Sequence, residues 1–338
     1  MQKLFRTNVW WAVIVPQVLG WIYFCFLDGT SNFGYGYRAF FCFFCGLIFT
    51  SAFGFLFNDL CDVDSDRKAG KANVMATLHP ALRVLLIAMN LTAALLGWFY
   101  LQASVLASVF FVLQIVSLIV YSLPPFRFKT RHIAGVLTDA FYGHVNPVLI
   151  TILVFGFRNT PDGEKSTSLF IPLLLLCTFL KGVRNILLHQ LDDRKNDRRA
   201  GDQTFVVRFG PLFTLNLINK LLWLELPATF LLVLNISYVV PPFFAVFLLF
   251  VLVSYLKFSG WKLAYLPQRQ LKFKFLYFLN DFYEGWMPVS FLLILAITHY
   301  WSFYVFLAIH LLLFPSFVLN LWRDIKQIRE NFKTEDEY

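Results

Sequence analysis

The fold of this chain follows from a short acidic stretch in an otherwise apolar sequence, which reads Asn58-Asp59-Leu60-Cys61-Asp62-Val63-Asp64-Ser65-Asp66. A second acidic stretch reads Asp192-Asp193-Arg194-Lys195-Asn196-Asp197. Each directly follows a long apolar segment, and together they hold 7 of the 20 carboxylates of the chain. Carboxylates gathered at the ends of two apolar helices repel each other unless cations neutralise them. The pair of stretches therefore indicates a site for divalent cations.

The composition is that of a polytopic membrane protein. Of the 338 residues, 58% are hydrophobic and only 14% are charged, whereas soluble domains have about 25% charged residues. No Pro-, Ser- or Gly-rich linker divides the chain, so we expect a single membrane domain over residues 1–338. The net charge of +9 does not indicate a nucleic-acid partner. The basic residues lie in short loops between apolar segments, where they record membrane orientation.

Ten segments are apolar enough to be candidate spans of a bilayer, which takes about 20 residues. They are residues 8–27, 38–57, 81–101, 103–122, 134–156, 168–190, 210–234, 237–256, 283–299 and 302–321. Because the tenth segment is 302–321, residues 302–338 are expected to form an extra span followed by a tail. Only His299, Tyr300 and Trp301 separate it from the segment before.

Basic residues orient these spans, because cytoplasmic loops carry an excess of Lys and Arg. The basic loops are 58–80, 123–132, 191–209 and 257–282. The opposite loops hold only Arg38, Arg158 and Lys165. Ten spans, rather than nine, also bring the basic C-terminal tail to the side of the basic loops. We therefore predict that both termini and both acidic stretches are cytoplasmic.

Spacing within the acidic stretches selects the metal ligands. If each preceding helix continues into its stretch, Asn58, Asp62 and Asp66 share one helix face at intervals of four. Asp193 and Asp197 repeat this spacing. Mg²⁺ takes oxygen ligands, often a few carboxylates together with phosphate oxygens. The two clusters therefore suit a diphosphate held through bridging Mg²⁺. The alternative is a pair of solvated, charged helix ends.

The apolar segment before the second stretch carries polar groups where they are costly, namely Lys181, Arg184, Asn185 and His189. Ionisable residues within a membrane usually face a cavity and mark function. Lys181 and Arg184 are therefore candidates to neutralise a phosphate. The alternative is that both side chains extend to the membrane interface, with their charged ends in water.

These residues resemble the UbiA family of intramembrane prenyltransferases. Members carry an NDxxDxxxD-type motif after the second helix and a DxxxD-type motif after the sixth, as Asn58–Asp66 and Asp193–Asp197 do here. A third signature, Tyr-Ser-x-Pro-Pro-x-Arg-x-Lys after the fourth helix, matches Tyr121–Lys129. The second motif also continues as in the family, with Gly201, Thr204 and Phe209-Gly210. The resemblance is strong over residues 8–256 and weaker in the C-terminal third.

The resemblance implies an all-α membrane helix bundle with a central cavity, made of nine family helices plus a tenth C-terminal span. It implies that Mg²⁺ holds the diphosphate of an isoprenyl donor. The implied metal ligands are Asn58, Asp62, Asp66, Asp193 and Asp197. The residues implied to contact the diphosphate are Lys71, Tyr121, Arg127, Lys129 and Asn185. The catalytic candidates are Asp59 as a base, and Lys181 and Arg184 as fixed positive charges where negative charge grows.

The acceptor end of the site is less constrained. Asp139, His144 and Asn146 lie in the fifth span and are candidates to orient an acceptor, although hydrogen bonding between helices is the alternative for His144 and Asn146.

Loop 257–282, followed by Glu284, is interpreted as an interfacial segment or lid, with helix capping by Asp281 as the simpler view. Many family members have Arg-Pro-Leu shortly after the first motif. This chain has Asn73-Val74-Met75-Ala76-Thr77-Leu78 there, which leaves the acceptor class open.

The favoured function is Mg²⁺-dependent transfer of an isoprenyl group from an isoprenyl diphosphate to a lipophilic, often aromatic, acceptor in the membrane. The alternative is a UbiA-type terpene cyclase, which ionises the same diphosphate without a separate acceptor. A membrane transporter is less favoured. Transport through intramembrane carboxylates predicts acidic residues near the bilayer midplane, whereas both clusters here follow apolar segments.

Overall fold

The computed structural model describes residues 10–27, 33–156, 169–263, 275–298 and 301–335, and those ranges contain helices, turns and loops but no strand. This confirms the all-helical architecture. The apolar segments form helices because backbone groups must bond internally where no water is available.

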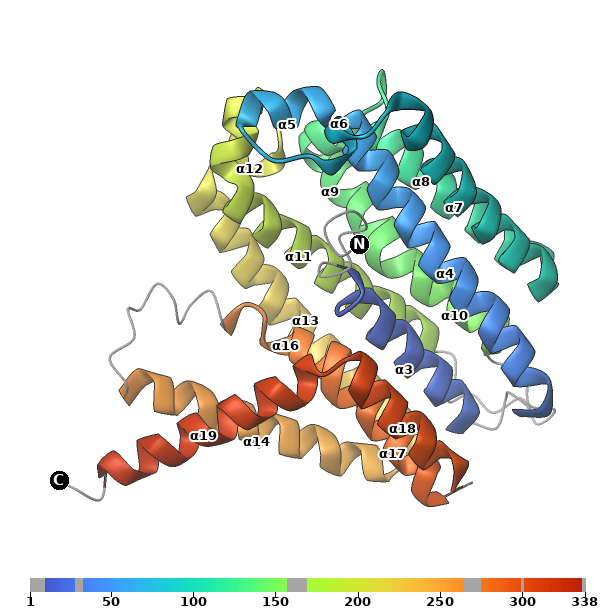
Figure 1. Cartoon of the computed structure of the whole chain (residues 1–338). Helices are drawn as coiled ribbons and strands as arrows, with labels where there is room; N and C mark the ends of the chain where they lie inside the picture. The colour runs from blue at the N-terminus through green and yellow to red at the C-terminus, as the bar shows by residue number, and fades with distance from the viewer. Residues whose placement is uncertain (1–9, 28–32, 157–168, 264–274, 299–300, 336–338) are drawn as a thin grey trace.

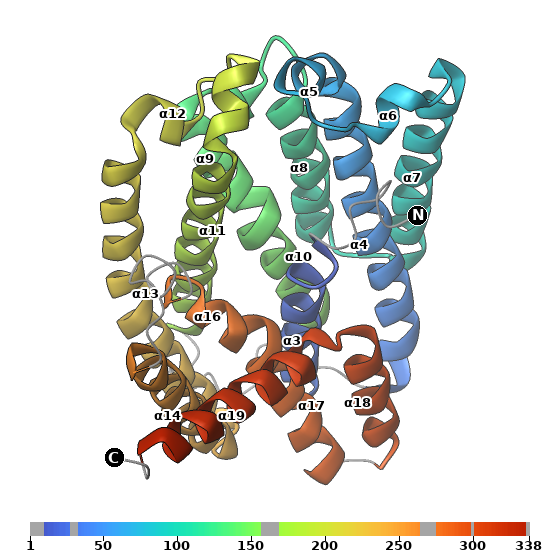
Figure 2. The same ribbon diagram turned by 60° about the vertical axis from the view of Figure 1, so that its left-hand side comes forward.

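The N-terminal part of the bundle leads to the first acidic stretch and back. It consists of α3 (Ile14–Leu27), α4 (Phe33–Cys61), α5 (Val63–Ala69), α6 (Val74–Thr77), α7 (Pro80–Leu101) and α8 (Val105–Ser122). Helices α4, α7 and α8 run along one side of the bundle in Figures 1 and 2. The short helices α5 and α6 lie at one end of it.

The middle of the chain forms the opposite side. It consists of η1 (Phe128–Thr130), α9 (His132–Ala140), the π-helical turn η2 (Phe141–Val145), α10 (Asn146–Phe155), α11 (Phe170–Ala200), α12 (Phe205–Phe209) and α13 (Pro211–Val239). In both views α12 lies at the same end as α5, while α3 and α10 lie between the two sides. This arrangement leaves the cavity described below between α4, α8, α9 and α11.

The C-terminal part packs against the other end of the bundle. It consists of α14 (Pro242–Leu263), α16 (Phe278–Asp281), the π-helical turn η4 (Phe282–Trp286), α17 (Met287–Thr298), α18 (Ser302–Leu313) and α19 (Ser316–Glu335). Aromatic rings fill its contacts, for example Phe243 stacked on Phe291 with ring centroids 4.5 Å apart. The C-terminal end of α19 lies away from α5 and α12 in both views (Figures 1 and 2).

Six helices of the described ranges are long and apolar enough to cross a membrane, or up to seven if one bent pair counts as a span. The six are Tyr37–Cys61, Pro80–Leu101, Val105–Ser122, His132–Phe155, Phe170–Ala200 and Pro211–Val239. They correspond to expected spans two to seven. Two further expected spans are shorter apolar helices, Ile14–Leu27 and Pro242–Phe258. The expected count of ten is therefore not confirmed.

The expected span 302–321 is interrupted. α18 ends at Leu313, and the axis turns by 76° before α19 continues from Ser316. Pro315 lies in this break, where its ring and its missing N–H end a helix. With 12 residues and a rise of about 1.5 Å per residue, α18 is short of the hydrocarbon thickness of about 30 Å. The segment is therefore two helices rather than one continuous span.

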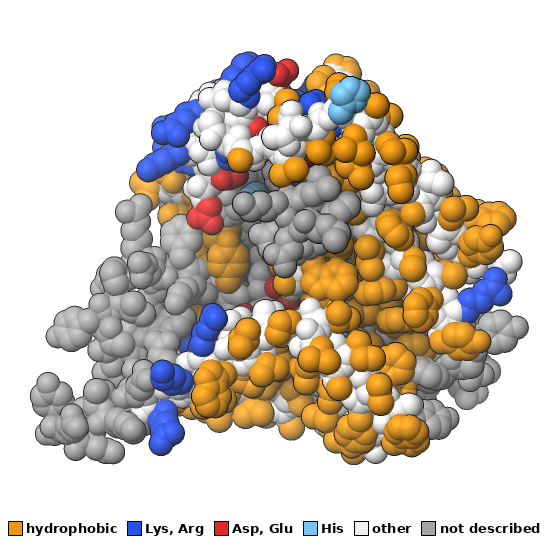
Figure 3. All heavy atoms as spheres, viewed as in Figure 1, with side chains coloured by type: hydrophobic (Ala, Val, Ile, Leu, Met, Phe, Trp, Pro, Cys, Tyr) orange, Lys and Arg blue, Asp and Glu red, His pale blue; other side chains and the backbone are white. Residues whose placement is uncertain are grey.

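The surface separates polar from apolar regions. Figure 3 shows Lys and Arg side chains gathered over the end of the bundle that carries α5 and α12, with acidic side chains beside them. Hydrophobic side chains cover the side formed by α4 and α7, where Phe99 is 73% exposed. Large apolar side chains facing outward at such exposure fit a surface in contact with lipid rather than water. The chain is an integral, multi-pass membrane protein.

Candidate active site

The two acidic stretches lie on helices that continue past the apolar segments, as their spacing requires. The Asp62 N–H donates to the Asn58 carbonyl at 3.0 Å, and the Asp66 N–H donates to the Asp62 carbonyl at 2.8 Å. In the second stretch, α11 continues without a break to Ala200. The five predicted metal ligands all line one cavity of about 510 Å³. Asn58, Asp62 and Asp66 therefore share a face that opens onto the same space as Asp193 and Asp197.

Basic residues from the loop after α8 hold the first acidic stretch. The ammonium of Lys129 contacts the Asp62 carboxylate directly and donates to Asn58 Oδ1 at 2.9 Å. Arg127 donates to Asp62 Oδ1 at 3.3 Å and to Ser65 Oγ at 3.0 Å. Burial lowers the pKa of Lys129, whereas the Asp62 carboxylate opposes that shift. Two predicted diphosphate contacts thus meet one predicted metal ligand.

Lys71 joins the first stretch to the second. Its ammonium donates to Asp193 Oδ2 at 2.9 Å, although Lys71 follows the first stretch in sequence and Asp193 belongs to the second. Asn196 donates to the other oxygen of Asp193 at 3.2 Å. Arg127 lies 3.9 Å from Asp202 as well as near Asp62, so it forms a second link. The loops therefore hold the two acidic helices together through cations that a phosphate can also bind.

The two stretches are also copies of one another in structure. Residues 58–73 and 189–204 correspond at a constant offset of 131 positions. The identical pairs are Leu60 and Leu191, Asp62 and Asp193, Asp66 and Asp197, Arg67 and Arg198, Ala69 and Ala200, and Gly70 and Gly201. Both glycines adopt left-handed backbone conformations, with φ of 73° and 83°. Such angles end a helix and favour glycine.

A polar side chain seven residues further on holds the last aspartate of each copy. Asn73 donates from Nδ2 to Asp66 Oδ2 at 2.8 Å. Thr204 donates from Oγ1 to Asp197 Oδ2 at 3.0 Å. Thr204 was recognised in the sequence as part of the second motif and Asn73 as following the first, but their support of the aspartates was not predicted. The sequence does contain a pattern that indicates this correspondence. Asp-Arg-x-Ala-Gly occurs in both stretches, and Asn73 and Thr204 follow it at matched positions.

The donor atoms at this end of the cavity suit Mg²⁺. They are carboxylate and amide oxygens, which hard cations prefer. Within the described part of the chain, no three His, Cys, Asp or Glu side chains are close enough to hold a metal ion by themselves. Mg²⁺ typically uses one or two carboxylates together with substrate phosphates and waters. The residues therefore fit a metal ion that arrives with a diphosphate, with Asp62 and Asp66 on one side and Asp193 and Asp197 on the other.

The predicted catalytic cations lie elsewhere. Lys181 is fully buried and donates to Gln17 Oε1 at 2.7 Å, while its ammonium lies 2.8 Å from Glu284 Oε1. Arg184 is fully buried as well and binds both carboxylate oxygens of Glu225, at 2.7 and 3.0 Å. Neither residue lines the cavity. Through these partners, Lys181 and Arg184 connect α11 with α3, η4 and α13. Both cations therefore contribute to the packing of the helices.

The remaining predicted residues divide between the cavity and its surroundings. Tyr121 and Asn185 line the cavity, as Lys71 and Lys129 do, whereas Arg127 and Asp59 do not. Asp59 is 3% exposed, and its carbonyl accepts a hydrogen bond from Asn73. Its predicted role as a base therefore gains no support from the position of its side chain.

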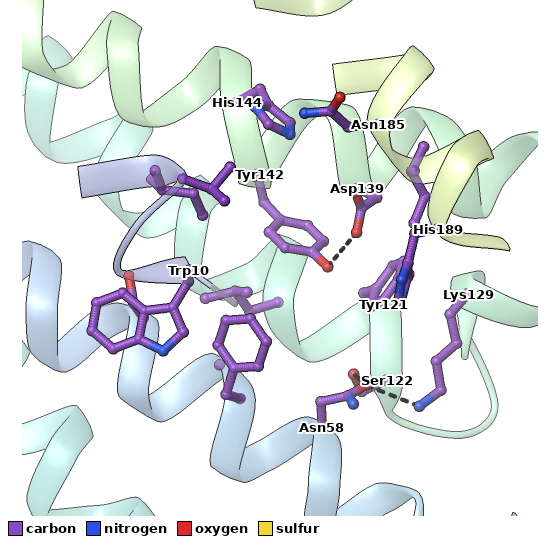
Figure 4. A pocket seen from close by; sticks show the side chains of 18 of the residues that line it. Trp10, Asn58, Tyr121, Ser122, Lys129, Asp139, Tyr142, His144, Asn185 and His189 are labelled. Atoms are coloured by element: carbon purple, nitrogen blue, oxygen red, sulfur yellow. Dashed lines mark hydrogen bonds between the residues drawn. The ribbon is translucent and has the colours of Figure 1, made fainter. Parts of the chain in front are cut away.

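A second polar group lines the cavity away from the acidic helix ends. It comes from α9, η2 and α11 and comprises Asp139, Tyr142, His144 and Asn185. Tyr142 donates from its hydroxyl to Asp139 Oδ2 at 2.7 Å. In Figure 4, Asp139 and Tyr142 lie between the His144–Asn185 pair and the group of Asn58, Ser122 and Lys129. Asn146, by contrast, bonds to Phe110 O and Gln114 on α8, which is the expected alternative of helix–helix hydrogen bonding.

The region interpreted as a lid is described in part, because residues 264–274 lie outside the described ranges. Tyr277 and Asn280 line the cavity. Asp281 makes no side-chain capping bond, and its carboxylate lies 3.4 Å from the Lys257 ammonium instead. Helix capping by Asp281 is therefore not observed.

The family model for the UbiA prenyltransferase family matches residues 10–282, which is most of the chain. The chain belongs to the UbiA prenyltransferase family. Membership explains why both acidic motifs and the Tyr121–Lys129 loop meet at one end of the cavity. No curated protein sequence matches the chain significantly.

Solved UbiA structures share this fold. A UbiA homologue from Archaeoglobus fulgidus bound to GPP and Mg²⁺ is 18% identical, with a TM-score of 0.57 over 84% of this chain and 97% of that one. The same homologue bound to DMAPP and Mg²⁺ gives a TM-score of 0.54 at 18% identity, over 84% and 96%. A digeranylgeranylglyceryl phosphate synthase is 14% identical, with a TM-score of 0.52 over 86% and 95%. The similarity covers nearly the whole of each solved UbiA chain.

Proposed function

We propose that this UbiA-family prenyltransferase transfers an isoprenyl group from an isoprenyl diphosphate to a lipophilic acceptor, with Mg²⁺ as its cofactor. The observation that carries the proposal is the meeting of both acidic motifs in one cavity, with Lys71 and Lys129 beside them. The A. fulgidus homologue with the same fold binds GPP or DMAPP together with Mg²⁺. The basic residues around this end also favour a site that faces the cytoplasm.

The cavity offers separate environments for the two ends of a donor. Carboxylates and lysines line the end formed by α5 and α11, where a diphosphate with its metal would bind. Aromatic and aliphatic side chains line the remainder, including Trp10, Phe43, Leu47, Trp98 and Phe111. An isoprenyl chain buried there would be kept from water, and so would an allylic cation formed from it. Aromatic faces also attract such a cation.

The chain's own cations have a defined part in the reaction. Bound Mg²⁺ would act as a Lewis acid on the diphosphate oxygens. Lys71 and Lys129 now pair with Asp193 and Asp62, so a metal ion at these carboxylates would release both ammonium groups toward a phosphate. Fixed positive charges placed where negative charge develops stabilise the transition state. This exchange of partners supports a role for both lysines at the donor end.

The test is product formation by the full chain in lipid nanodiscs. Dimethylallyl, geranyl and geranylgeranyl diphosphate are supplied with Mg²⁺, with and without a lipid extract as the source of acceptor. Mass spectrometry then detects prenylated lipid, and a coupled assay detects released diphosphate. We expect both products to require Mg²⁺ and the extract. A cyclic hydrocarbon or alcohol formed from the diphosphate alone would establish the cyclase alternative instead.

Matched variants locate the reaction at the proposed site. Asp62→Ala and Asp193→Ala are expected to abolish both products. Asp64→Ala and Asp192→Ala provide the controls, because these neighbouring carboxylates do not line the cavity and Asp64 is paired with Arg67 at the surface. Near-normal product formation by Asp62→Ala or Asp193→Ala would contradict the proposal.

A further inference from the structure

The π-helical turn η2 presents a buried histidine to the cavity without giving it a partner. His144 is 8% exposed and lines the cavity, and its Nδ1 has no hydrogen-bond partner. Its ring packs on α11, where a Cβ at Gly182 would lie only 3.0 Å from His144 Cδ2. π-helical turns frequently occur at functional sites. A buried imidazole nitrogen that has no partner among the described residues calls for a ligand.

Asn185 faces the same part of the cavity with its orientation fixed. Asn280 donates from Nδ2 to Asn185 Oδ1 at 3.1 Å. Asn280 is held in turn by Arg184, which donates to Asn280 Oδ1 at 2.7 Å. Because the oxygen of Asn185 accepts the bond from Asn280, the amide nitrogen of Asn185 is the group left to donate. Among the described residues, that nitrogen has no acceptor.

Asp139 completes the group with an acceptor oxygen. One carboxylate oxygen is bonded to the Tyr142 hydroxyl at 2.7 Å. The carboxylate also interacts with the Tyr121 side chain. It keeps acceptor capacity, because the two oxygens of a carboxylate offer about four lone-pair sites. Figure 4 shows Asp139 on the side of His144 and Asn185 that faces Asn58 and Ser122, that is, toward the donor end. Together these residues offer one donor, one acceptor and one imidazole, which can do either.

The charges around this group disfavour an anion. Lys181 and Arg184 are nearby on α11, but their charges are paired with Glu284 and Glu225. In the described part of the chain, Lys71 and Lys129 are the Lys and Arg residues that line the cavity, and both lie at the donor end. His189 lines the cavity as well, and its Nε2 lies 4.0 Å from Asp193 Oδ2. Among the described residues, an anionic ligand at His144 would therefore meet the Asp139 carboxylate and no unpaired Lys or Arg side chain. Burying an unpaired charge is far more costly than burying a hydroxyl that bonds on both sides.

We propose that His144, Asn185 and Asp139 form an acceptor subsite that recognises an uncharged hydroxyl group, of an alcohol or a phenol, rather than a carboxylate or a phosphate. The hydroxyl accepts a hydrogen bond from Asn185 and donates one to Asp139 or His144. The proposal rests on the proposed prenyltransferase function, because it assigns the second substrate of the same cavity. It thereby names the chemical class that the sequence left open.

Binding to the full chain in phosphatidylcholine nanodiscs tests the subsite without turnover. The protein is first saturated with Mg²⁺ and geranyl thiolodiphosphate, an unreactive donor analogue. Two probe pairs are then titrated by calorimetry. One pair is methyl 4-hydroxybenzoate and 4-hydroxybenzoate, and the other is a monoalkyl glycerol ether and its phosphate ester. We expect the uncharged member of at least one pair to bind about ten-fold or more tightly than its charged partner.

Variants then assign that binding to the subsite. His144→Phe is expected to lower the affinity for the uncharged probe by about ten-fold, because one hydrogen bond to a buried group is lost. His144→Asn, which keeps a donor and an acceptor, restores much of the affinity. The matched control is His310→Phe, because His310 is also buried, at 3% exposure, but bonds to Tyr23 and does not line the cavity. Binding of the donor analogue stays unchanged in all three variants.

Three outcomes would overturn the subsite: tighter or equal binding of the charged probes, unchanged affinity in His144→Phe, or no binding of any probe to protein saturated with the analogue. Failure of the wild-type chain to bind the donor analogue with Mg²⁺ is a different result. It would overturn the proposed function, and the acceptor subsite with it.

Discussion

At the scale of single residues, the site depends on side chains that hold its carboxylates in place. Asp66 and Asp197 each accept a hydrogen bond from a residue seven positions later, Asn73 and Thr204 respectively. A bond of this kind fixes one oxygen and leaves the other directed at the cavity. Groups that orient metal ligands typically contribute about 10- to 100-fold to metal affinity.

Thr204→Val tests this role, because it removes the hydroxyl and keeps the shape. We expect the Mg²⁺ concentration for half-maximal activity to rise about ten-fold, with little change in the apparent affinity for the donor at saturating Mg²⁺. Thr214→Val is the control, since Thr214 is equally buried but bonds only to the Gly210 carbonyl. The measurement is a Mg²⁺ titration of diphosphate release. An unchanged Mg²⁺ requirement in Thr204→Val would remove Thr204 from the site.

The sequence predicted which carboxylates would share a helix face at the cavity, but not the partners of the buried cations. Asn58, Asp62 and Asp66 share a face because helical spacing fixes it, and no tertiary information is needed. Lys181 and Arg184 were predicted to serve the diphosphate, yet they pair with Glu284 and Glu225. Those partners lie on other helices, so only the packing of α11 against α13 and η4 decides the pairing. For the same reason, the sequence did not distinguish His144, whose Nδ1 has no partner among the described residues, from Asn146, which bonds to α8.

At the scale of elements, the pair Arg184–Glu225 connects α11 with α13 in the apolar interior. Both side chains are fully buried, and Arg184 also donates to the Leu276 carbonyl at 2.5 Å. Breaking one half of a buried pair leaves an uncompensated charge, whereas replacing both halves by apolar groups is often neutral. This pair therefore allows a test in which the single variant is expected to destabilise the chain more than the double variant does.

We expect Glu225→Gln to lower the free energy of unfolding by about 3–5 kcal/mol. The double variant Arg184→Met with Glu225→Leu should recover most of that loss. Denaturation of the purified chain in mixed micelles measures both. Equal destabilisation by the single and the double variant would show that shape, rather than charge, matters at this contact.

The contact between α4 and α7 depends on a small residue. A Cβ at Gly97 would lie 3.1 Å from the Cys42 carbonyl oxygen and 3.2 Å from the Gly46 nitrogen. These are backbone atoms, which cannot rotate away. Small residues at such crossings let helix backbones approach closely within membranes.

Gly97→Ala is therefore expected to destabilise the chain by about 1–3 kcal/mol, as overpacking does. Gly46→Ala is the matched control on the facing helix. Its added Cβ would meet nothing closer than the Ala94 carbonyl oxygen at 4.0 Å. The same denaturation assay compares the two variants. A larger loss for Gly46→Ala would contradict the packing described here.

At the scale of the whole molecule, the proposed donor site lies between two corresponding parts of the chain. The first copy of the acidic helix follows α4, and the second ends α11. Ion pairs between Lys71 and Asp193 and between Arg127 and Asp202 connect them in the described structure. A diphosphate with its metal would replace these links and bind both copies at once.

Donor binding should therefore stabilise the entire bundle. At a concentration of 100 times its dissociation constant, an unreactive isoprenyl diphosphate analogue with Mg²⁺ is expected to add about 2.7 kcal/mol to the free energy of unfolding. The analogue without Mg²⁺, or with a chelator, should add little. Thermal unfolding followed by fluorescence provides the measurement. Asp193→Ala should lose the effect and Asp192→Ala should keep it, and stabilisation that survives in Asp193→Ala would exclude a site shared by both helices.

The architecture was predictable to different degrees along the chain. Expected spans two to seven correspond to long apolar helices, because hydrophobic length is a strong signal in a membrane protein. The C-terminal part was less predictable. Residues 302–321 are apolar enough for one span, but Pro315 and the contacts of α14 with α19, including Lys257 with Asp324 at 2.8 Å, accompany a change of direction. Hydropathy alone does not record such a bend.

The ends of the two acidic helices determine in which form a donor can arrive. Ala69 and Ala200, the last residues of α5 and α11, both line the cavity, so two helix C-termini face it together with the carboxylates. A helix C-terminus acts as about half a negative charge. A bare diphosphate would therefore be repelled on entry, whereas its magnesium complex carries less negative charge and would be repelled less. Binding is then ordered: metal-free isoprenyl diphosphate should neither enter nor inhibit, even when it is in large excess over the complex.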